Sequence, residues 1–385
     1  MNQFFTCFIS GAGFLIAFLL FFHPLQQNIK ANKWLGFFVF IMACAFINAY
    51  LMITNTVITN RFLFKYLNSL QFLLGQSLLI SILYFVNPLK QFKPADWLHF
   101  IPFGLYICIE NMLPFGNGGL STYPLFTIND EVSFLVRDIL PFMLLFYLAK
   151  SFTILKKHKA NLKQISSSID GIDLSWLIQF LFILLFITIV WINDAFFELK
   201  LLTEATNLLY AGAIFFLAYF SVKQKAIFLF KDKDIKEISG LIETTIDTHK
   251  NHGLQQKQVK SKRLSDEQIA ILFDRLSVLM EQDKLFLDPD LNLPSLAEKL
   301  GINIHDASSL INQTTRDNFY NFINKHRVEE AKKLLTSSKI DQFSILGIAF
   351  ASGFNSKTTF NTAFKKWTGT SPSAYAKNHK TCPDG

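Results

Sequence analysis

The first 222 residues alternate long apolar runs with short polar segments. A helix needs about 20 mostly apolar residues to cross the hydrocarbon core of a bilayer. Seven runs approach this length: 4–22, 34–53, 66–86, 97–113, 132–149, 174–192 and 207–222. The sixth, LSWLIQFLFILLFITIVWI, carries no charge and lacks the polar stripe of a helix on a soluble core. The pattern predicts seven transmembrane helices, in preference to a large soluble helical protein.

The lysine and arginine residues predict an orientation for these spans. Loops after the first, third and fifth runs carry nine, whereas loops after the second, fourth and sixth carry three. Since positive loops stay in the cytoplasm, we expect the N-terminus outside and the C-terminus inside a bacterial inner membrane. The first run has no preceding positive residue and no small-residue cleavage site, so we interpret it as a span and not a signal peptide.

Five ionisable residues share the expected outer side of the membrane. They are Glu110, Arg137, Asp138, Asp194 and Glu204. Charges at membrane depth are costly and tend to face a cavity or to pair. They suggest an outer pocket for an unknown, cationic or donor-rich ligand. The alternative is a structural pair between Arg137 and Asp138 with ordinary interfacial charges around it.

The C-terminal part contains one arrangement twice. Ala297 and Ala349 each stand four residues before a glycine, Gly301 and Gly353. In a helix-turn-helix, a small alanine lets two helices approach closely, and glycine supplies the positive φ of the turn. The spacing therefore predicts two helix-turn-helix motifs.

Each motif continues into a short amphipathic helix with an asparagine as its expected cap, Asn303 for the first and Asn355 for the second. The second helix, about 356–367, exposes a polar face suited to base edges and phosphates: Lys357, Thr358, Asn361, Thr362 and Lys365. The first, about 304–312, exposes His305, Ser308, Ser309 and Asn312. A continuous helix over 318–335, about 27 Å long, joins the motifs. Such a rod could hold the two reading helices about one DNA turn apart.

Residues 291–376 resemble the AraC-type double helix-turn-helix domain. The matching stretches are SLAEKLGI, NKHRVEEAKKLL and SGFNSKTTFNTAFKKWTGTSPSAY. The resemblance implies that His305, Ser308 and Ser309, then Lys357, Thr358 and Thr362, contact bases, and the polar faces add Asn312, Asn361 and Lys365. Seven spans ahead of such a domain resemble membrane-embedded AraC-type regulators.

The charges divide the chain into three regions. Residues 1–222 are sparsely charged, residues 223–263 form a basic connector, and residues 264–385 carry 14 basic and 14 acidic groups. Asp306 lies in the first reading helix, and residues 342–382 hold five lysines and no acid. We therefore expect the second motif to supply most of the phosphate attraction. One charge-balanced domain should bind DNA weakly, so two copies in a homodimer would raise affinity through effective concentration.

The sequence thus predicts an all-α membrane-bound one-component regulator that senses a signal and binds double-stranded promoter DNA. The alternatives are a seven-helix receptor whose tail recruits a protein partner and a transporter with a regulatory tail. No catalytic set occurs in the spans, and the four cysteines show no ligand-like spacing, so we predict no enzyme activity, metal or cofactor.

Overall fold

The computed structural model describes residues 3–22, 28–57, 59–112, 139–196, 200–224, 237, 264–337 and 343–380. Every regular element in these ranges is helical, which confirms the all-α prediction. The chain divides into two units. The N-terminal unit comprises Met1–Lys157 and Leu174–Ile227, and the C-terminal unit comprises His158–Asp173 and Phe228–Gly385.

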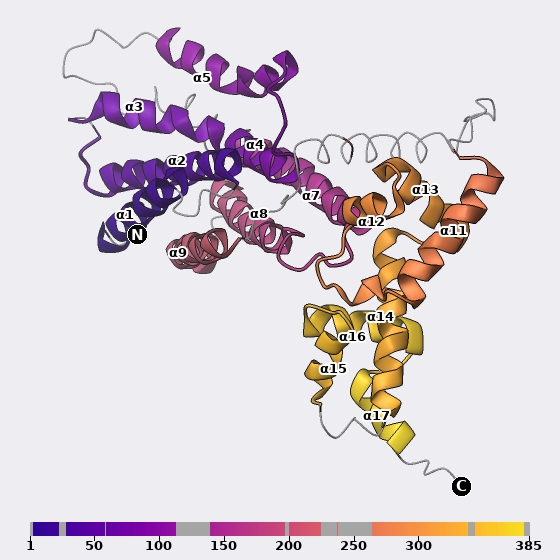
Figure 1. Cartoon of the computed structure of the whole chain (residues 1–385). Helices are drawn as coiled ribbons and strands as arrows, with labels where there is room; N and C mark the ends of the chain where they lie inside the picture. Colours follow the sequence, from indigo (N-terminus) through magenta and orange to yellow (C-terminus); the bar gives the residue numbers. More distant parts are fainter. Residues whose placement is uncertain are drawn as a thin grey trace. The chain divides into compact units, whose positions relative to one another are not determined.

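The N-terminal unit is a bundle of apolar helices (Figure 1). Within it, α1 packs along α2, α2 against α4, and α8 against α9. Its elements are α1 (Gln3–Phe21), α2 (Ile29–Ile53), α3 (Arg61–Leu70), η1 (Gln71–Leu73), α4 (Leu74–Val86), η2 (Pro94–Phe100), α5 (Ile101–Met112), α7 (Leu140–Ile165), α8 (Ser175–Phe196) and α9 (Lys200–Lys223). The last residues of α7, 158–165, belong to the C-terminal unit.

Four described segments are long and apolar enough to cross a membrane: Gln3–Phe21, Ile29–Ile53, Phe62–Val86 and Ser175–Asn193. They correspond to the first, second, third and sixth predicted spans, so the prediction of seven is corrected to four among the described residues. The fourth run forms the 3-10 segment η2 followed directly by α5, whose description ends at Met112, and it is not among these four. Of the seventh run, Leu208–Ser221 is described as a shorter apolar stretch within α9, and the fifth run begins outside the described residues.

The outward faces of these helices are apolar. Phe4, Phe18 and Phe22 are 72%, 58% and 70% exposed on the first helix and just after it, and Phe182 of α8 is 56% exposed. Large exposed apolar patches mark surfaces that need another partner, and on helices of spanning length a lipid bilayer meets that need. The N-terminal unit is therefore suited to a membrane.

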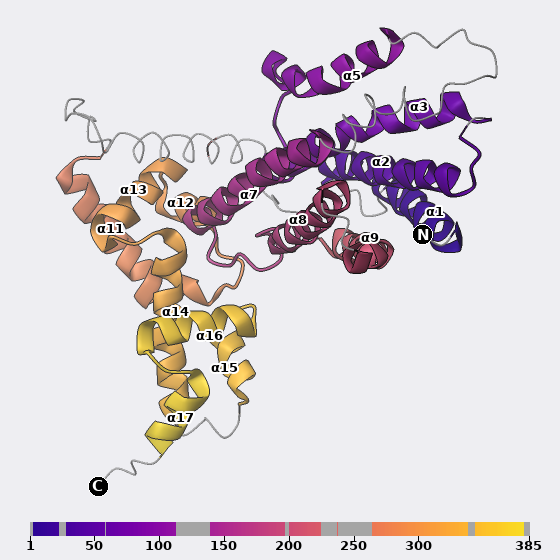
Figure 2. The ribbon, with the colours of Figure 1, turned by 180° about the vertical axis from the view of Figure 1, so that it is seen from behind.

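The C-terminal unit is built around one long helix, α14. Its elements are α11 (Asp266–Glu281), η4 (Leu285–Leu287), α12 (Leu293–Leu300), α13 (Ile304–Thr315), α14 (Phe319–Thr336), α15 (Ile345–Ala351), α16 (Lys357–Thr368) and α17 (Pro372–Lys380). Helix α14 contacts α13 as well as α15, α16 and α17, as both views of the ribbon show (Figures 1 and 2).

Two apolar cores lie along α14. Phe319, Phe322 and Ile323 of its first half join a core with α11, α12 and α13. Val328, Ala331 and Leu335 of its second half join another with α15, α16 and α17. One 18-residue helix thus carries both motifs, as the sequence predicts, beginning one residue later than expected.

Candidate nucleic-acid interface

The first helix-turn-helix has the predicted turn. Helix α12 ends at Gly301, whose φ of 73° lies in the left-handed region. Ala297 is buried against the next helix, and Asn303 caps α13 by accepting a hydrogen bond from the backbone N–H of Asp306 at 2.8 Å. The alanine, glycine and asparagine therefore have the roles that their spacing predicts.

The polar face of α13 is partly engaged within the helix. Asn312 is exposed, whereas His305, Ser308 and Ser309 are half-buried. The amide of Gln313 donates to the hydroxyl of Ser309 at 2.8 Å, and that of Asn312 lies 3.5 Å from the Ser308 hydroxyl. A base edge would have to compete for these groups, so the face is less available than an exposed one.

The second helix-turn-helix confirms the glycine and corrects the cap. Gly353 has a φ of 87°, and Ala349 is fully buried. The cap of α16 is Ser356, whose hydroxyl accepts from the backbone N–H of Thr359 at 3.1 Å. The predicted cap, Asn355, lies one residue too early, and its side-chain oxygen accepts a hydrogen bond from Ser168 at 2.8 Å. Two neighbouring good capping residues made this choice ambiguous from sequence alone.

The polar face of α16 is open to solvent. Lys357, Thr358, Thr362 and Lys365 are exposed and Asn361 is half-buried. On the opposite side, Phe360 and Phe364 are fully buried in the second core. The helix therefore presents two lysines, two hydroxyls and an amide together, which is the chemistry needed for phosphates and base edges.

A buried arginine, which the sequence analysis did not single out, lies between the two cores. Arg327 of α14 is fully buried. Its Nε donates to the carbonyl of Phe286 at 2.7 Å, and its Nη2 donates to the carbonyl of Asp288 at 2.7 Å. Burial lowers the pKa of this guanidinium to about 10, so it stays charged at neutral pH. Among the described residues no carboxylate lies at hydrogen-bond distance from it. Its hydrogen bonds to carbonyl and hydroxyl oxygens therefore offset the free-energy cost of burying the charge.

Two of those acceptors come from residue Ser167, in the segment that joins α7 to α8. Arg327 donates to the Ser167 hydroxyl at 2.9 Å and to its carbonyl at 3.3 Å. We call residues 166–173 the strap. Nothing in the sequence pattern marks it, because its polar residues look like an ordinary loop and its partners lie more than 120 positions away.

The predicted ligand site lies outside the described residues. Arg137 and Asp138 fall in an undescribed range, and the side chains of Glu110, Asp194 and Glu204 are likewise outside the description, although their backbones lie in α5, α8 and α9. The outer pocket therefore stays a prediction.

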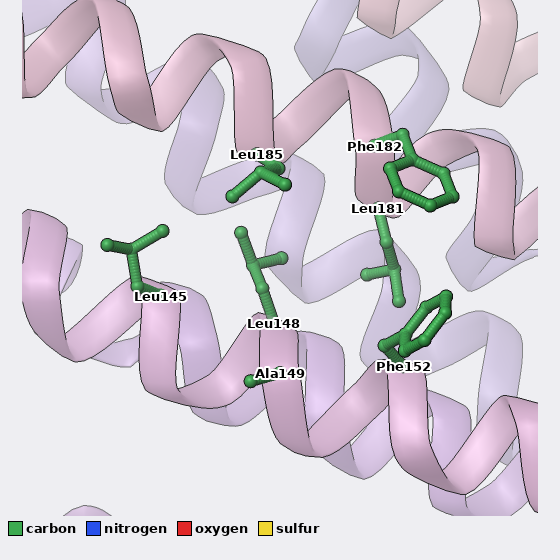
Figure 3. A pocket seen from close by; sticks show the side chains of 7 residues that line it. All are labelled: Leu145, Leu148, Ala149, Phe152, Leu181, Phe182 and Leu185. Atoms are coloured by element: carbon green, nitrogen blue, oxygen red, sulfur yellow. The ribbon is translucent and has the colours of Figure 1, made fainter.

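A different cavity, of about 380 Å³, lies between α7 and α8 (Figure 3). Its lining is wholly apolar: Leu145, Leu148, Ala149, Phe152, Leu181, Phe182 and Leu185. Such a lining suits a hydrocarbon, such as a lipid acyl chain, and contributes no charged or hydrogen-bonding side chain for a polar ligand.

Comparison with known protein families supports the prediction of a helix-turn-helix domain in the C-terminal unit. Residues 296–378 match the family described as a helix-turn-helix domain, which covers α13 to α16 and most of α12 and α17. No curated protein and no solved structure matches the chain. The C-terminal region of this protein thus contains a helix-turn-helix DNA-binding domain of the AraC type, which implies a role in transcriptional regulation.

Proposed function

We propose that this protein is a membrane-bound transcriptional regulator that binds promoter DNA through α13 and α16 and is controlled by its N-terminal unit. The observation that carries the proposal is the polar face of α16, which stays exposed while its apolar face is fully buried. Helices of spanning length in the same chain supply the membrane attachment.

The two motifs contribute unequally in this proposal. Helix α16 brings Lys357 and Lys365 to the phosphates, whereas α13 holds Asp306 in its first turn and engages its serines internally. The second motif therefore provides most of the attraction, and the first refines the sequence preference.

Substitutions on α16 should separate sequence reading from phosphate binding. We expect Asn361→Ala to relax sequence preference, because a good base contact is worth about 1–3 kcal/mol of discrimination. Lys365→Ala should weaken binding to all DNA sequences by a similar factor. It should also reduce the salt dependence of binding by about one phosphate contact. The measurement is a binding titration at several salt concentrations, with the full chain in detergent and genomic fragments that it enriches.

Lys325→Ala provides the matched control, since this exposed lysine lies on α14, outside both reading helices. It should leave sequence preference unchanged. If the wild-type chain enriches no genomic fragment, the DNA reading fails, and recruitment of a protein partner by the tail becomes the better explanation.

The proposal requires the C-terminal unit in the cytoplasm, and the lysine and arginine count of the predicted loops favours an N-terminus outside. A reporter that is active only in the cytoplasm should therefore be active at Gly385 and inactive at Met1. Activity at both ends would mean an even number of spans, and inactivity at Gly385 would contradict the DNA-binding proposal.

The signal enters through the N-terminal unit in this proposal. The acids Glu110, Asp138, Asp194 and Glu204 with Arg137 remain the candidate ligand site, and the basic connector 223–263 and a homodimer remain the candidate route to the tails. A ligand can act only if it binds one arrangement of the chain better than another.

A further inference from the structure

The strap is part of the DNA-binding unit although it lies between two helices of the N-terminal unit in the sequence. Leu162 and Ile165 of α7 and Ile169 of the strap are buried in the first core of the C-terminal unit. A domain that began at residue 264 would lack these three side chains in its first core.

The polar atoms of the strap reach the first motif and the linker helix. The backbone N–H of Ser167 and its hydroxyl both donate to the carbonyl of Leu291, at 3.2 and 2.6 Å. The carbonyl of Ser167 accepts from Asn324 of α14 at 3.0 Å, as well as from Arg327. These bonds are buried, so replacing them with water would require the unit to open.

The same strap reaches the second motif. The carboxylate of Asp170 accepts hydrogen bonds from the hydroxyls of Ser356 and Thr359, the latter at 2.6 Å. Ser356 is the cap of α16, and a negative charge at a helix N-terminus is favourable. Ser168 adds its bond to Asn355 in the turn before α16. The strap therefore joins Leu291, α14 and the start of α16.

We propose that the strap is a positioning element that holds the two reading helices in their DNA-binding arrangement, so that α7 and α8 control DNA binding through it. This proposal rests on the proposed function. The strap supports the reading face and does not mask it, because Lys357, Thr358 and Thr362 remain exposed while Asp170 is bound.

The placement of the strap makes it a direct route from the membrane. It follows α7 and precedes α8 without a linker, so any change in these two helices acts on its two ends. By contrast, the connector 223–263 enters the C-terminal unit ahead of α11, far in sequence from α16. Withdrawal of Asp170 would remove two hydrogen bonds from the cap region of α16.

The test compares Asp170→Ala with Asp173→Ala in the full chain in detergent. Asp173→Ala is the matched control, because it also removes one negative charge from the strap. The carboxylate of Asp173 pairs with Lys159 at 2.8 Å, whereas that of Asp170 binds at the start of α16. Hydrogen exchange of the α16 amides measures docking without DNA. A second measurement is the affinity for the genomic fragment most enriched by the wild-type chain.

We expect Asp170→Ala to raise exchange at the first turns of α16 about tenfold and to weaken DNA binding by about the same factor, as loss of hydrogen bonds to a charged group predicts. Asp173→Ala should change both less than threefold. Thr359→Val removes one of the two hydroxyls that bind Asp170, and it should raise exchange less in the Asp170→Ala background than in the wild-type chain, because the two residues share one interaction.

If hydrogen exchange of the α16 amides is unchanged in Asp170→Ala, the proposed docking of the strap on the start of α16 is wrong. Raised exchange with unchanged or tighter DNA binding would overturn the positioning role, and tighter binding would identify the strap as a mask. If the exchange responds while the wild-type chain binds no DNA, the proposed function fails and the docking of the strap stands.

Discussion

Replacing Gly353 by alanine is expected to destabilise the second helix-turn-helix by roughly 3–5 kcal/mol, combining a left-handed backbone with steric overlap. A Cβ at this position would lie 2.5 Å from the carbonyl oxygen of Phe286 and 2.8 Å from the Cα of Leu287. Both are backbone atoms of the η4 segment, which cannot move aside as a flexible side chain could. The glycine therefore serves the turn and also a close contact with the loop before the first motif.

Gly301→Ala is the matched control. Gly301 has a similar φ of 73°, but the nearest atom to its Cβ would be a terminal nitrogen of Arg275 at 4.0 Å. Its cost should be only the left-handed strain, about 1–2 kcal/mol. Hydrogen exchange of α12 and α13 for Gly301→Ala, and of α15 and α16 for Gly353→Ala, measures both opening free energies in the full chain. Equal effects would show that the backbone contact adds nothing.

The comparison of these glycines shows what the sequence can predict. The spacing from Ala349 to Gly353 predicts a turn, and the structure confirms its positive φ. It cannot predict that Phe286 and Leu287 press on that turn, because the contact joins residues more than 60 positions apart. Local geometry follows from local residue types, whereas close packing between distant segments depends on the whole fold.

The predicted number of spans, seven, was corrected to four among the described residues for a different reason. Hydropathy reports composition alone, whereas the described part of the run at 97–113 is a 3-10 segment followed by the α-helix Ile101–Met112. Pro94 and the side chain of Asp96 fit the start of this segment, since Asp96 accepts from the backbone N–H of Lys93 at 2.8 Å. Where a helix begins within an apolar run was therefore a matter of local hydrogen bonding.

The reading faces were predictable and the strap was not. The 3.6-residue period places Phe360 and Phe364 in the core and Lys357 and Lys365 outside, as the structure confirms. Ser167 carries no such pattern. Ser167 matters because it accepts hydrogen bonds from Arg327. Helical periodicity shows which face of α14 is apolar, but it does not show which oxygen atoms a buried charge on that helix will find as acceptors.

Replacing Arg327 by methionine is expected to destabilise the C-terminal unit by roughly 3–5 kcal/mol, because each buried acceptor left unsatisfied costs about 1–3 kcal/mol. The carbonyls of Phe286 and Asp288 would lose the donors that reach them at 2.7 Å. Arg327→Lys keeps the charge but offers a single ammonium in place of the planar fork, so it should recover only part of the loss. Lys325→Ala, two residues away and exposed, should change stability by less than about 0.5 kcal/mol.

The location of the damage distinguishes a general packing role from the clamp that the hydrogen bonds describe. Arg327 holds Ser167 by its hydroxyl and its carbonyl, so Arg327→Met should raise exchange at the Ser167 amide together with the amides of α14. The Ser167 amide is a sensitive probe because it donates to the carbonyl of Leu291, just before the first motif. If α14 loosens while Ser167 stays protected, the strap is held by its apolar residues, and Arg327 stabilises the linker helix alone. If both loosen together, one buried guanidinium fastens the strap onto the helix-turn-helix domain.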